Sequence, residues 1–430
     1  MTADIVLGGG VAGLAASYAA RQATGQGLTI YEAAARPGGL LDSFEARPGW
    51  RFDHGVHLSF ASEPEVRAVF DQTPYLTHEA RSLNWDRGHW LRHPVQNNMH
   101  PLPAQDKAEL IMGLVNRPEL TIGSYRDWLV YQYGEPMAER WPLTYTRKYW
   151  TLEASEMGTD WIGSRMRRSD LHEVLLGAMT DDTPNSYYIS QMRYPERGGY
   201  RAFIEPLMAE ADVRCGHRAV RVDWRRREIL FDNGATAGYD RMVSTMPLPE
   251  LVRLMPDVPE DVAQAADSLF ATRMDLISVG LSREAVSPSL WFYIYDEDIL
   301  AARVYSPSWK SPHNAPDGCS SLQFEVYSSR HRPLTLSVEA LTENCLAALE
   351  RMGLARREEV VFTHHKHVPY ANVVFDLGME ARRNHVREWV QSKGIVLAGR
   401  FGEWDYLWSN QAFMSGLRAA RVLQGAPPAA

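Results

Sequence analysis

The chain has 430 residues, of which 45% are apolar, and it carries a formal net charge of −8 at neutral pH with a pI near 6.0. This length allows two or three structural units with buried cores, and the acidic balance argues against a protein drawn to nucleic acid or to anionic membranes. No apolar run has the length of a membrane span, and three widely spaced cysteines indicate neither a disulfide framework nor a zinc site. We therefore expect a soluble, cytoplasmic protein with reduced thiols and no bound metal.

The N-terminal residues predict a βαβ unit that binds a dinucleotide. Residues 5–7 form a short apolar strand, the glycine-rich segment 8–13 follows, residues 14–21 predict a helix rich in small residues, and residues 28–32 predict the next strand. In such a unit the first glycine permits a tight turn, the second lets the backbone approach a pyrophosphate, and the third lets helix and strand pack closely. The phosphates meet the positive end of the helix, and an acid ending the second strand can bind a ribose. The cofactor-binding residues expected here are Gly8, Gly10, Val11, Ala12, Gly13 and Glu32.

After the βαβ unit the composition and the periodicity of the sequence change several times. Residues 83–188 are rich in tryptophan, tyrosine and arginine and carry helical patterns at 105–115 and 124–133, which predict a largely helical insertion. The later elements expected are, in chain order, strands within 213–240 with a hairpin turn at 232–234, a strand at 240–247, an antiparallel sheet within 274–327, a helix at 336–352, a buried strand at 394–399 and a closing helix at 411–423.

The segment after Glu32 contains Arg36 and a second glycine doublet, Gly38-Gly39. Taken alone, the arginine could be a surface charge and the doublet an ordinary loop. Together with the N-terminal fingerprint, which NAD and FAD share, they resemble the flavoprotein family that includes amine oxidases, protoporphyrinogen oxidases and UDP-galactopyranose mutases. This resemblance implies a non-covalently bound FAD. It also implies that the cofactor lies along Arg36, Gly38, Gly39 and Leu40, with Val220 on the adenine side and Gly399 at the flavin.

The family resemblance also gives the expected fold class, which is α/β. It consists of a discontinuous Rossmann-like FAD-binding domain formed by residues 1–82, 195–270 and 386–425. A mainly helical substrate domain is inserted at 83–194, and an antiparallel β-sheet domain at 271–385.

A sharper resemblance, to the UDP-galactopyranose mutases, covers nearly the whole chain in order. The segments that carry it are Phe-Asp-His-Gly-Val-His at 52–57, His-Pro-Val-Gln-Asn-Asn at 93–98, Tyr-Thr-Arg-Lys-Tyr-Trp at 145–150, Trp-Ile-Gly-Ser-Arg at 161–165, Trp-Phe-Tyr at 291–293 with an arginine at 303, and Gly-Arg-Phe-Gly-Glu-Trp-Asp-Tyr at 399–406 with Asn-Gln at 410–411. In that family these segments bring a histidine and an Asn-Gln pair to the flavin, and tyrosines and arginines to a nucleoside diphosphate.

The resemblance assigns roles to individual residues. It implies that His57, Arg165 and Arg303 lie at the reacting centre, although we assign no proton transfer to His57. The substrate-binding residues it implies are His93, Gln96, Asn97, Tyr145, Trp161, Tyr293, Tyr406 and Asn410, and the additional flavin-binding residues are Gly55, Val56, His57, Arg400, Asn410 and Gln411.

A physical argument supports the same pocket chemistry. A nucleoside diphosphate needs fixed cations, and guanidinium groups match phosphate oxygens in pairs, while tyrosines supply hydroxyl donors and aromatic faces for a base. Arg165, Arg303, Tyr293, Tyr370 and Tyr406 provide such groups from distant parts of the chain. Each alone fits a surface ion pair or core packing equally well, so the ordered set carries the interpretation.

The sequence also departs from the mutase pattern. Val56 replaces the second glycine of the usual Gly-Gly-His, and His93 stands where relatives often have tyrosine. The segment after residue 411 is shorter than in the eukaryotic mutases, and the asparagine that those enzymes have upstream of residues 191–195 has no counterpart. The sugar and the base are therefore left open.

Three functions are compatible with these residues. The first is an FAD-dependent nucleotide-sugar pyranose–furanose mutase, an isomerase in which N5 of the reduced flavin attacks the anomeric carbon of a nucleoside-diphosphate sugar, with NAD(P)H as one candidate reductant. The alternative is an FAD-dependent oxidase or desaturase of the amine oxidase or protoporphyrinogen oxidase type, which would use the same N-terminal unit. The third is a flavin-binding protein without catalysis. The physiological reductant and the oligomeric state are not predicted.

Overall fold

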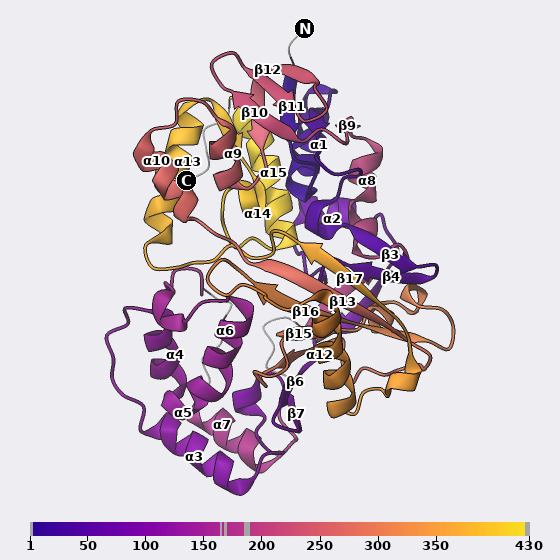
Figure 1. Cartoon of the computed structure of the whole chain (residues 1–430), viewed down its shortest axis with the longest axis vertical. Helices are drawn as coiled ribbons and strands as arrows, with labels where there is room; N and C mark the ends of the chain where they lie inside the picture. Colours follow the sequence, from indigo (N-terminus) through magenta and orange to yellow (C-terminus); the bar gives the residue numbers. More distant parts are fainter. Residues whose placement is uncertain (1–2, 164–165, 167–169, 185–189, 426–430) are drawn as a thin grey trace.

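The computed structural model describes residues 3–163, 166, 170–184 and 190–425, and it contains two seven-stranded sheets and a helical lobe. In Figure 1 the first sheet and its helices lie at the top, the second sheet crosses the middle, and the helical lobe lies at the lower left. The expected α/β class is confirmed. The domain boundaries given above remain a prediction.

The first sheet is built around the predicted βαβ unit. Its strand order is β10-β11-β12-β1-β2-β9, with β18 paired to the end of β12. The β1, β2, β9, β18 and β12 pairings are parallel, whereas β10 and β11 form an antiparallel extension. The strands are β1 (Ala3–Leu7), β2 (Thr29–Tyr31), β9 (Val213–Arg214), β10 (Ala219–Asp223), β11 (Glu228–Phe231), β12 (Thr236–Ser244) and β18 (Ile395–Leu397). The helices of this part are α1 (Val11–Thr24), α2 (Pro64–Phe70), α8 (Glu205–Ala209), α9 (Leu248–Leu254), α10 (Glu260–Ser268), α13 (Met379–Ser392), α14 (Gly399–Gly402) and α15 (Ser409–Leu423).

Close packing of α15 on α1 brings the C-terminal segment to the glycine-rich turn. A Cβ atom at Gly416 of α15 would lie 2.1 Å from the carbonyl oxygen of Ala12 in α1, so only glycine permits this approach. The strand expected at 394–399 and the helix expected at 411–423 are present as β18 and α15. The first helix, α1, and the last helix of the described chain, α15, thus pack directly against each other.

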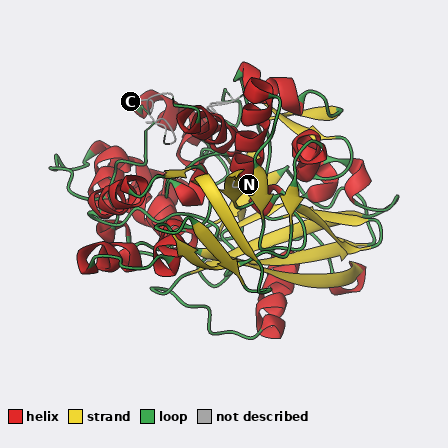
Figure 2. Ribbon diagram, turned by 90° about the horizontal axis from the view of Figure 1, so that it is seen from above, coloured by secondary structure: helices red, strands yellow, loops and turns green. Residues whose placement is uncertain are grey.

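The second sheet has the order β17-β13-β16-β15-β14-β6-β7 and is antiparallel except for the β14·β6 pair. Its strands are β6 (Ser82–Asp86), β7 (His89–Arg92), β13 (Arg273–Leu281), β14 (Trp291–Ile294), β15 (Arg303–Tyr305), β16 (Ser320–Ser328) and β17 (Val360–Val368). Seen from above, the strands run as a twisted fan across the molecule (Figure 2). The other elements beside it are the hairpin of β3 (Ser43–Arg47) with β4 (Trp50–Asp53) and the helices α11 (Pro307–Lys310) and α12 (Val338–Arg351).

Alternation along β16 gives this sheet two chemically different faces. Leu322, Phe324 and Val326 join an apolar cluster with α12, and Gln323 and Glu325 point to the opposite face. Every residue of β16 is buried. A buried polar face of this kind must find hydrogen-bond partners, and it finds them in the candidate site described below.

A hairpin of the second sheet lies at the start of the insertion that the sequence predicts to be largely helical. Residues 82–92 form this β6–β7 hairpin, in which Arg87 and Gly88 take positive φ angles of 47° and 86° and close a tight turn between the strands. At the other end of the insertion, β8 (Gln191–Pro195) pairs with β5 (Tyr75–Glu79). The lobe itself consists of α3 (Ala104–Val115), α4 (Tyr125–Tyr133), α5 (Glu135–Ala138), a π-helical turn (Glu139–Leu143), α6 (Thr144–Tyr149) and α7 (Leu171–Met179).

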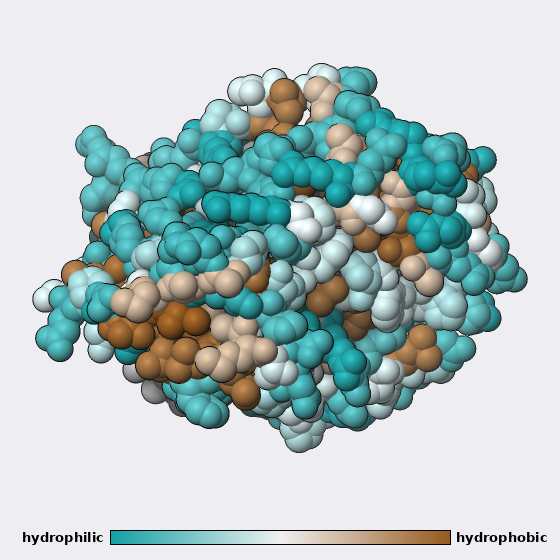
Figure 3. Space-filling model, turned by 90° about the horizontal axis from the view of Figure 1, so that it is seen from below, coloured by the Kyte–Doolittle hydropathy of each residue, from teal (hydrophilic) through white to brown (hydrophobic). Residues whose placement is uncertain are grey.

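Viewed from below, the surface is largely hydrophilic and has a hydrophobic area on the side of the helical lobe (Figure 3). Exposed apolar side chains on α3 and α7 include Met112, Val115, Leu176 and Met179. None of the helices in the described ranges combines the length and the hydropathy that crossing a membrane requires.

Candidate functional site

The glycine-rich turn has the shape that a dinucleotide diphosphate requires. Gly8 has a φ of +103°, and a Cβ atom at Gly13 would lie 2.1 Å from the carbonyl oxygen of Gly8, so turn and helix are in direct backbone contact. At Gly10, by contrast, an added Cβ would meet no atom within 4 Å. The open space therefore lies at the one glycine that the fingerprint assigns to the pyrophosphate, at the N-terminus of α1.

Glu32 holds the turn from the end of β2. Its two carboxylate oxygens accept hydrogen bonds from the backbone N–H groups of Gly9 and Ala34, at 2.6 and 2.7 Å. His217, just before β10, donates its backbone N–H to the carbonyl oxygen of Glu32. The strand that contains Val220 thus starts beside the acid, although the Val220 side chain itself is exposed.

The second glycine doublet lies against the first. Gly38 donates its N–H to the carbonyl oxygen of Gly9 at 2.9 Å, and Leu40 follows in a short 3₁₀ turn. Arg36 is held by both oxygens of Asp42, at 2.7 and 2.6 Å, and Arg201 binds the same carboxylate. Arg36 is therefore fixed beside the glycine-rich turn by an ion pair that the sequence did not reveal.

The C-terminal segment contacts the start of α1, next to the glycine-rich turn. Gly399 has a φ of +79°, and an added Cβ would lie 2.8 Å from the Cβ of Ala12. The other residues expected at the flavin make structural contacts: Arg400 donates to the backbone oxygens of Leu407 and Ala371, Asn410 donates to Glu63, and Gln411 accepts from the backbone of Trp408 at the start of α15.

Residues 54–57, called here the histidine loop, are anchored to the polar face of β16. The backbone N–H of Gly55 donates to Gln323, and that of Val56 donates to Glu325 at 2.7 Å. His57 is largely buried, with its ring 5.2 Å from that of Tyr200. Burial lowers the pKa of His57 to about 3, against the opposing attraction of Asp53, so the imidazole is neutral and cannot serve as an acid near neutral pH.

A cavity of about 320 Å³ lies between the helical lobe and the second sheet. Seven of the residues predicted to bind substrate or act at the reacting centre line it: His93, Gln96, Tyr145, Trp161, Tyr293, Arg303 and Tyr406. Nine further large side chains line it that were not predicted: Tyr125, Tyr133, Met137, Trp141, Tyr149, Trp150, Met166, Tyr295 and Trp408.

Aromatic rings form one part of the cavity wall. Tyr145 stacks on Tyr149 with ring centroids 5.3 Å apart and an interplanar angle of 18°, and it meets Tyr293 edge-on at 5.4 Å. The ring of His93 lies 5.1 Å from that of Tyr293, and burial lowers the pKa of His93 to about 4. This wall is uncharged and offers flat faces to a planar group.

Arg303 and the phenol groups of Tyr149 and Tyr406 form another part of the cavity wall. Arg303 pairs with Glu325 at 2.7 Å and lies over the ring of Tyr149 at 5.7 Å. The hydroxyl groups of Tyr149 and Tyr406 are 3.1 Å apart, and the guanidinium of Arg400 lies over the Tyr406 ring. Hydroxyl donors and guanidinium groups gathered in this way can bind an anionic group such as a phosphate.

Other predicted substrate residues lie elsewhere. In the described part of the chain, Asn97, Tyr370 and Asn410 do not line this cavity: Asn97 donates to Glu173 on α7, and Tyr370 donates to Glu250 on α9. Arg165 falls outside the described residues, so its role stays a prediction.

Two residues of the site were missed for different reasons. Tyr149 follows Tyr145 by four residues on α6, and this i,i+4 spacing could have indicated that both rings share one helix face. Glu325 gave no local signal, because a single glutamate in a strand acquires its role only from partners that folding brings to it.

Comparison with known proteins fits this geometry. The family model described as "Flavin containing amine oxidoreductase" matches residues 11–424. The chain belongs to that family. Membership of the flavin-containing amine oxidoreductases indicates an enzyme that uses a flavin, and the open space at Gly10 fits such a cofactor.

Several solved structures share the fold over nearly the whole chain. A crystal structure of reduced UDP-galactopyranose mutase superposes with a TM-score of 0.92 at 24% identity, covering 99% of this chain and 96% of that one. A putrescine oxidase bound to putrescine gives 0.65 at 18% identity with 99% of each chain covered, and a conjugated-linoleic-acid-producing fatty acid isomerase from P. acnes gives 0.65 at 14%, covering 99% and 98%. These proteins are an oxidase and two kinds of isomerase, so the fold does not select the reaction.

Proposed function

We propose that this protein binds FAD non-covalently and is a nucleotide-sugar pyranose–furanose mutase. The observation that carries the proposal is the meeting of Arg303, Tyr149 and Tyr406 in an aromatic-walled cavity whose arginine shares a carboxylate with the histidine loop. The similarity to reduced UDP-galactopyranose mutase supports the same interpretation. The substrate class is a nucleoside-diphosphate sugar, and NAD(P)H is the reductant to test first, in a cytoplasmic setting.

The residues that would hold FAD are those of the two glycine segments. Gly8, Gly10 and Gly13 shape the turn at the N-terminus of α1, where free N–H groups favour the diphosphate. Glu32, which follows β2, would bind the ribose, and Gly38-Gly39 and Gly399, which lie against Gly10 and Ala12, would line the cofactor. When bound, reduced flavin supplies the nucleophile, its N5, for the anomeric carbon of the sugar.

The chain itself would contribute binding, orientation and charge. The rings of Tyr145, Tyr293 and His93 offer faces on which a base can stack, which orients the nucleotide. Arg303 and the hydroxyl groups of Tyr149 and Tyr406 would bind the diphosphate and stabilise the charge that grows on it as it leaves the sugar. With substrate bound, the aromatic side chains of the wall would limit the access of water, which would otherwise capture the sugar.

An oxidase acting on amines is the second candidate, because the family description and the putrescine oxidase similarity both point to that chemistry. The cavity is less suited to it. A cationic amine would approach Arg303 and a wall of tyrosines that offers no carboxylate among the residues described as lining the cavity.

One experiment separates the two functions. The flavoprotein is reduced anaerobically with dithionite, offered a panel of nucleotide sugars, and the products are separated by chromatography; in parallel, oxygen uptake is measured with a panel of amines. Formation of a furanose without net oxidant consumption supports the mutase. Oxygen uptake with an amine, and no isomer from any nucleotide sugar, would replace the proposal with the oxidase.

A further inference from the structure

A fully buried ion pair lies behind the histidine loop. Lys310, at the end of α11, is 3.1 Å from Asp53, at the end of β4, and the two side chains are 0% and 1% exposed. Burying two charges is costly, and a buried pair is often no more stabilising than apolar residues of the same volume. Fold stability alone is therefore a weak reason for this arrangement.

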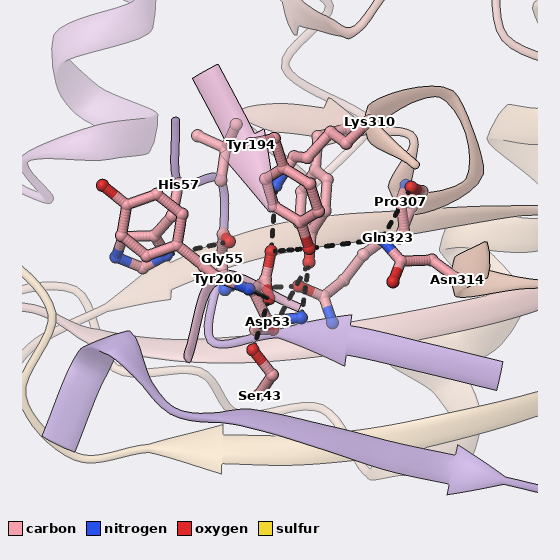
Figure 4. Close-up of polar contacts among 12 residues, drawn as sticks. Ser43, Asp53, Gly55, His57, Tyr194, Tyr200, Pro307, Lys310, Asn314 and Gln323 are labelled. Atoms are coloured by element: carbon pink, nitrogen blue, oxygen red, sulfur yellow. Dashed lines mark hydrogen bonds and ion pairs between the residues drawn. The ribbon is translucent and has the colours of Figure 1, made fainter. Parts of the chain in front are cut away.

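The carboxylate of Asp53 is saturated with donors (Figure 4). One oxygen accepts from the Ser43 hydroxyl at 2.7 Å and from the Tyr200 backbone N–H at 3.0 Å. The other accepts from the Tyr194 hydroxyl at 2.9 Å and from Lys310. Burial opposes the charge, but Lys310 and the Tyr200 N–H outweigh it, so the pKa of Asp53 lies below its usual value and the group stays ionised.

The lysine is held just as tightly. Its Nζ lies 3.8 Å from the ring centre of Tyr305 and 4.9 Å from that of Tyr194, which is favourable cation–π geometry. The Tyr305 hydroxyl in turn accepts the backbone N–H of Asp53 at 3.1 Å. Tyr305 ends β15, the strand that begins with Arg303.

This network touches the histidine loop from two sides. Asp53 is the residue from which the loop departs, so fixing it fixes the start of the loop. Tyr200, whose backbone binds Asp53, presents the ring that lies 5.2 Å from His57. The pair thus determines where the loop begins, what His57 packs against and how the strand carrying Arg303 is tied to both.

We propose that Lys310 and Asp53 are positioning residues that hold the histidine loop in the conformation that receives the flavin. The proposal rests on the proposed binding of FAD but not on mutase activity. Its consequence is specific: loss of the pair changes flavin affinity and reduction potential even when the fold survives. A purely structural pair would affect the stability of the fold alone.

The test compares single and double variants by readouts that do not need turnover. Lys310→Met leaves Asp53 buried without its cation, so both the melting temperature of the apoprotein and the FAD affinity should fall. The double variant Lys310→Met/Asp53→Asn removes both charges and should recover most of the melting temperature. It should still bind FAD about tenfold more weakly than the wild type, with a shifted midpoint potential and flavin absorption spectrum.

A second buried pair provides the matched control. Arg140 and Asp86 are 2.8 Å apart in the helical lobe, and their side chains are 8% and 2% exposed. Arg140→Met/Asp86→Asn should leave FAD affinity and midpoint potential unchanged. FAD affinity is measured by quenching of flavin fluorescence on titration of the apoprotein, and the potential by spectroelectrochemistry.

Each outcome supports or overturns the proposal. If Lys310→Met/Asp53→Asn binds FAD with wild-type affinity and potential, the positioning role is overturned. If the Lys310 variants do not fold, Tyr194→Phe, which removes one hydrogen bond to Asp53 and keeps the pair, must lower the FAD affinity and shift the midpoint potential from the wild-type value, and wild-type affinity and potential in this variant overturn the proposal as well. Failure of the wild type to bind FAD at all would instead contradict the proposed function.

Discussion

Arg303 and Val56 bind opposite oxygens of one buried carboxylate, that of Glu325. The guanidinium lies 2.7 Å from one oxygen, and the backbone N–H of Val56 lies 2.7 Å from the other. The Tyr327 hydroxyl also donates to this carboxylate, at 2.8 Å. The side chain proposed to meet the diphosphate and the loop proposed to meet the flavin are therefore held by a single group that is completely buried.

The first prediction concerns Glu325→Gln. A carboxylate has two acceptor oxygens and an amide has one, so either Arg303 or Val56 loses its partner in this variant. Because breaking a buried pair leaves a charge unpaired, we expect the free energy of unfolding to fall by about 3 kcal/mol. Both UDP and FAD should bind more weakly, as followed by calorimetry and by flavin fluorescence.

The matched control for Glu325→Gln is Glu359→Gln, because Glu359 pairs with a half-exposed arginine, Arg283, at 2.9 Å. It should cost much less stability and leave both ligands bound as in the wild type. Weakened binding of only one ligand in Glu325→Gln would contradict the shared role of this carboxylate.

A second prediction separates the cofactor role of Gly10 from the packing role of Gly13. An added Cβ at Gly10 meets no atom within 4 Å and the φ of −76° suits any residue, so Gly10→Ala should leave the apoprotein as stable as the wild type. It should lower FAD affinity at least about tenfold, because the methyl group occupies the path of the diphosphate. Gly13→Ala drives a Cβ to 2.1 Å from the Gly8 oxygen and should destabilise the apoprotein by about 2 kcal/mol.

Thermal unfolding of the two apoproteins and FAD titration check this pair of variants. Unchanged FAD affinity in Gly10→Ala would mean that the diphosphate does not lie at this turn. Equal stability of the Gly13 variant and the wild type would mean that helix and turn can separate, against the contact seen here.

The sequence alone predicts the dinucleotide-binding turn, whereas the residues of the substrate site were predicted only through the family resemblance. The glycine turn and Glu32 form a local pattern whose parts lie within one βαβ unit, so the sequence shows it directly. Arg303 and Tyr406 come from distant segments, and only the ordered resemblance pointed to both. In the structure both residues line the same cavity.

What the sequence did not predict are specific partnerships of individual side chains. Asp42 binds Arg36, Lys310 binds Asp53, and Glu325 binds Val56, yet none of these partners follows from a local period. Tyr370 shows the same dependence on partners that folding brings together. It has the right chemistry for a phosphate, but folding directs its hydroxyl to Glu250 on α9.

The third prediction concerns the hydroxyl groups of Tyr149 and Tyr406, which are 3.1 Å apart. If both bind one diphosphate, Tyr149→Phe and Tyr406→Phe should each lower UDP affinity and kcat/KM about tenfold. The double variant should lose less than the product of the two, because the hydroxyls act as a unit.

Calorimetry with UDP measures this cycle without turnover. Tyr131→Phe, on the half-exposed outer face of α4, is the control and should bind UDP as the wild type does. Fully additive losses in the cycle would contradict the coupling expected between the two hydroxyls.

The last prediction concerns the response to acid. Burial lowers the pKa of His57 to about 3 and that of His93 to about 4, whereas an unfolded chain has histidines near 6.5. The folded pKa values are depressed, so the stability linked to these neutral rings is fully present above pH 6.5. As the pH falls from 6.5 towards 4, these two histidines take up protons in the unfolded chain, whereas in the folded protein their rings resist protonation. Each histidine then costs up to about 1.4 kcal/mol of stability per pH unit.

Urea unfolding of the apoprotein at pH 7, 6 and 5 measures this slope. His57→Asn and His93→Asn should each flatten it, whereas His172→Asn, at an exposed position, should leave it unchanged. Since His57 stays neutral throughout this range, the variant should also leave the acid limb of any pH–rate profile in place. An acid limb that disappears with His57 would show that this imidazole does exchange a proton during turnover, which its burial beside Asp53 and Lys310 argues against.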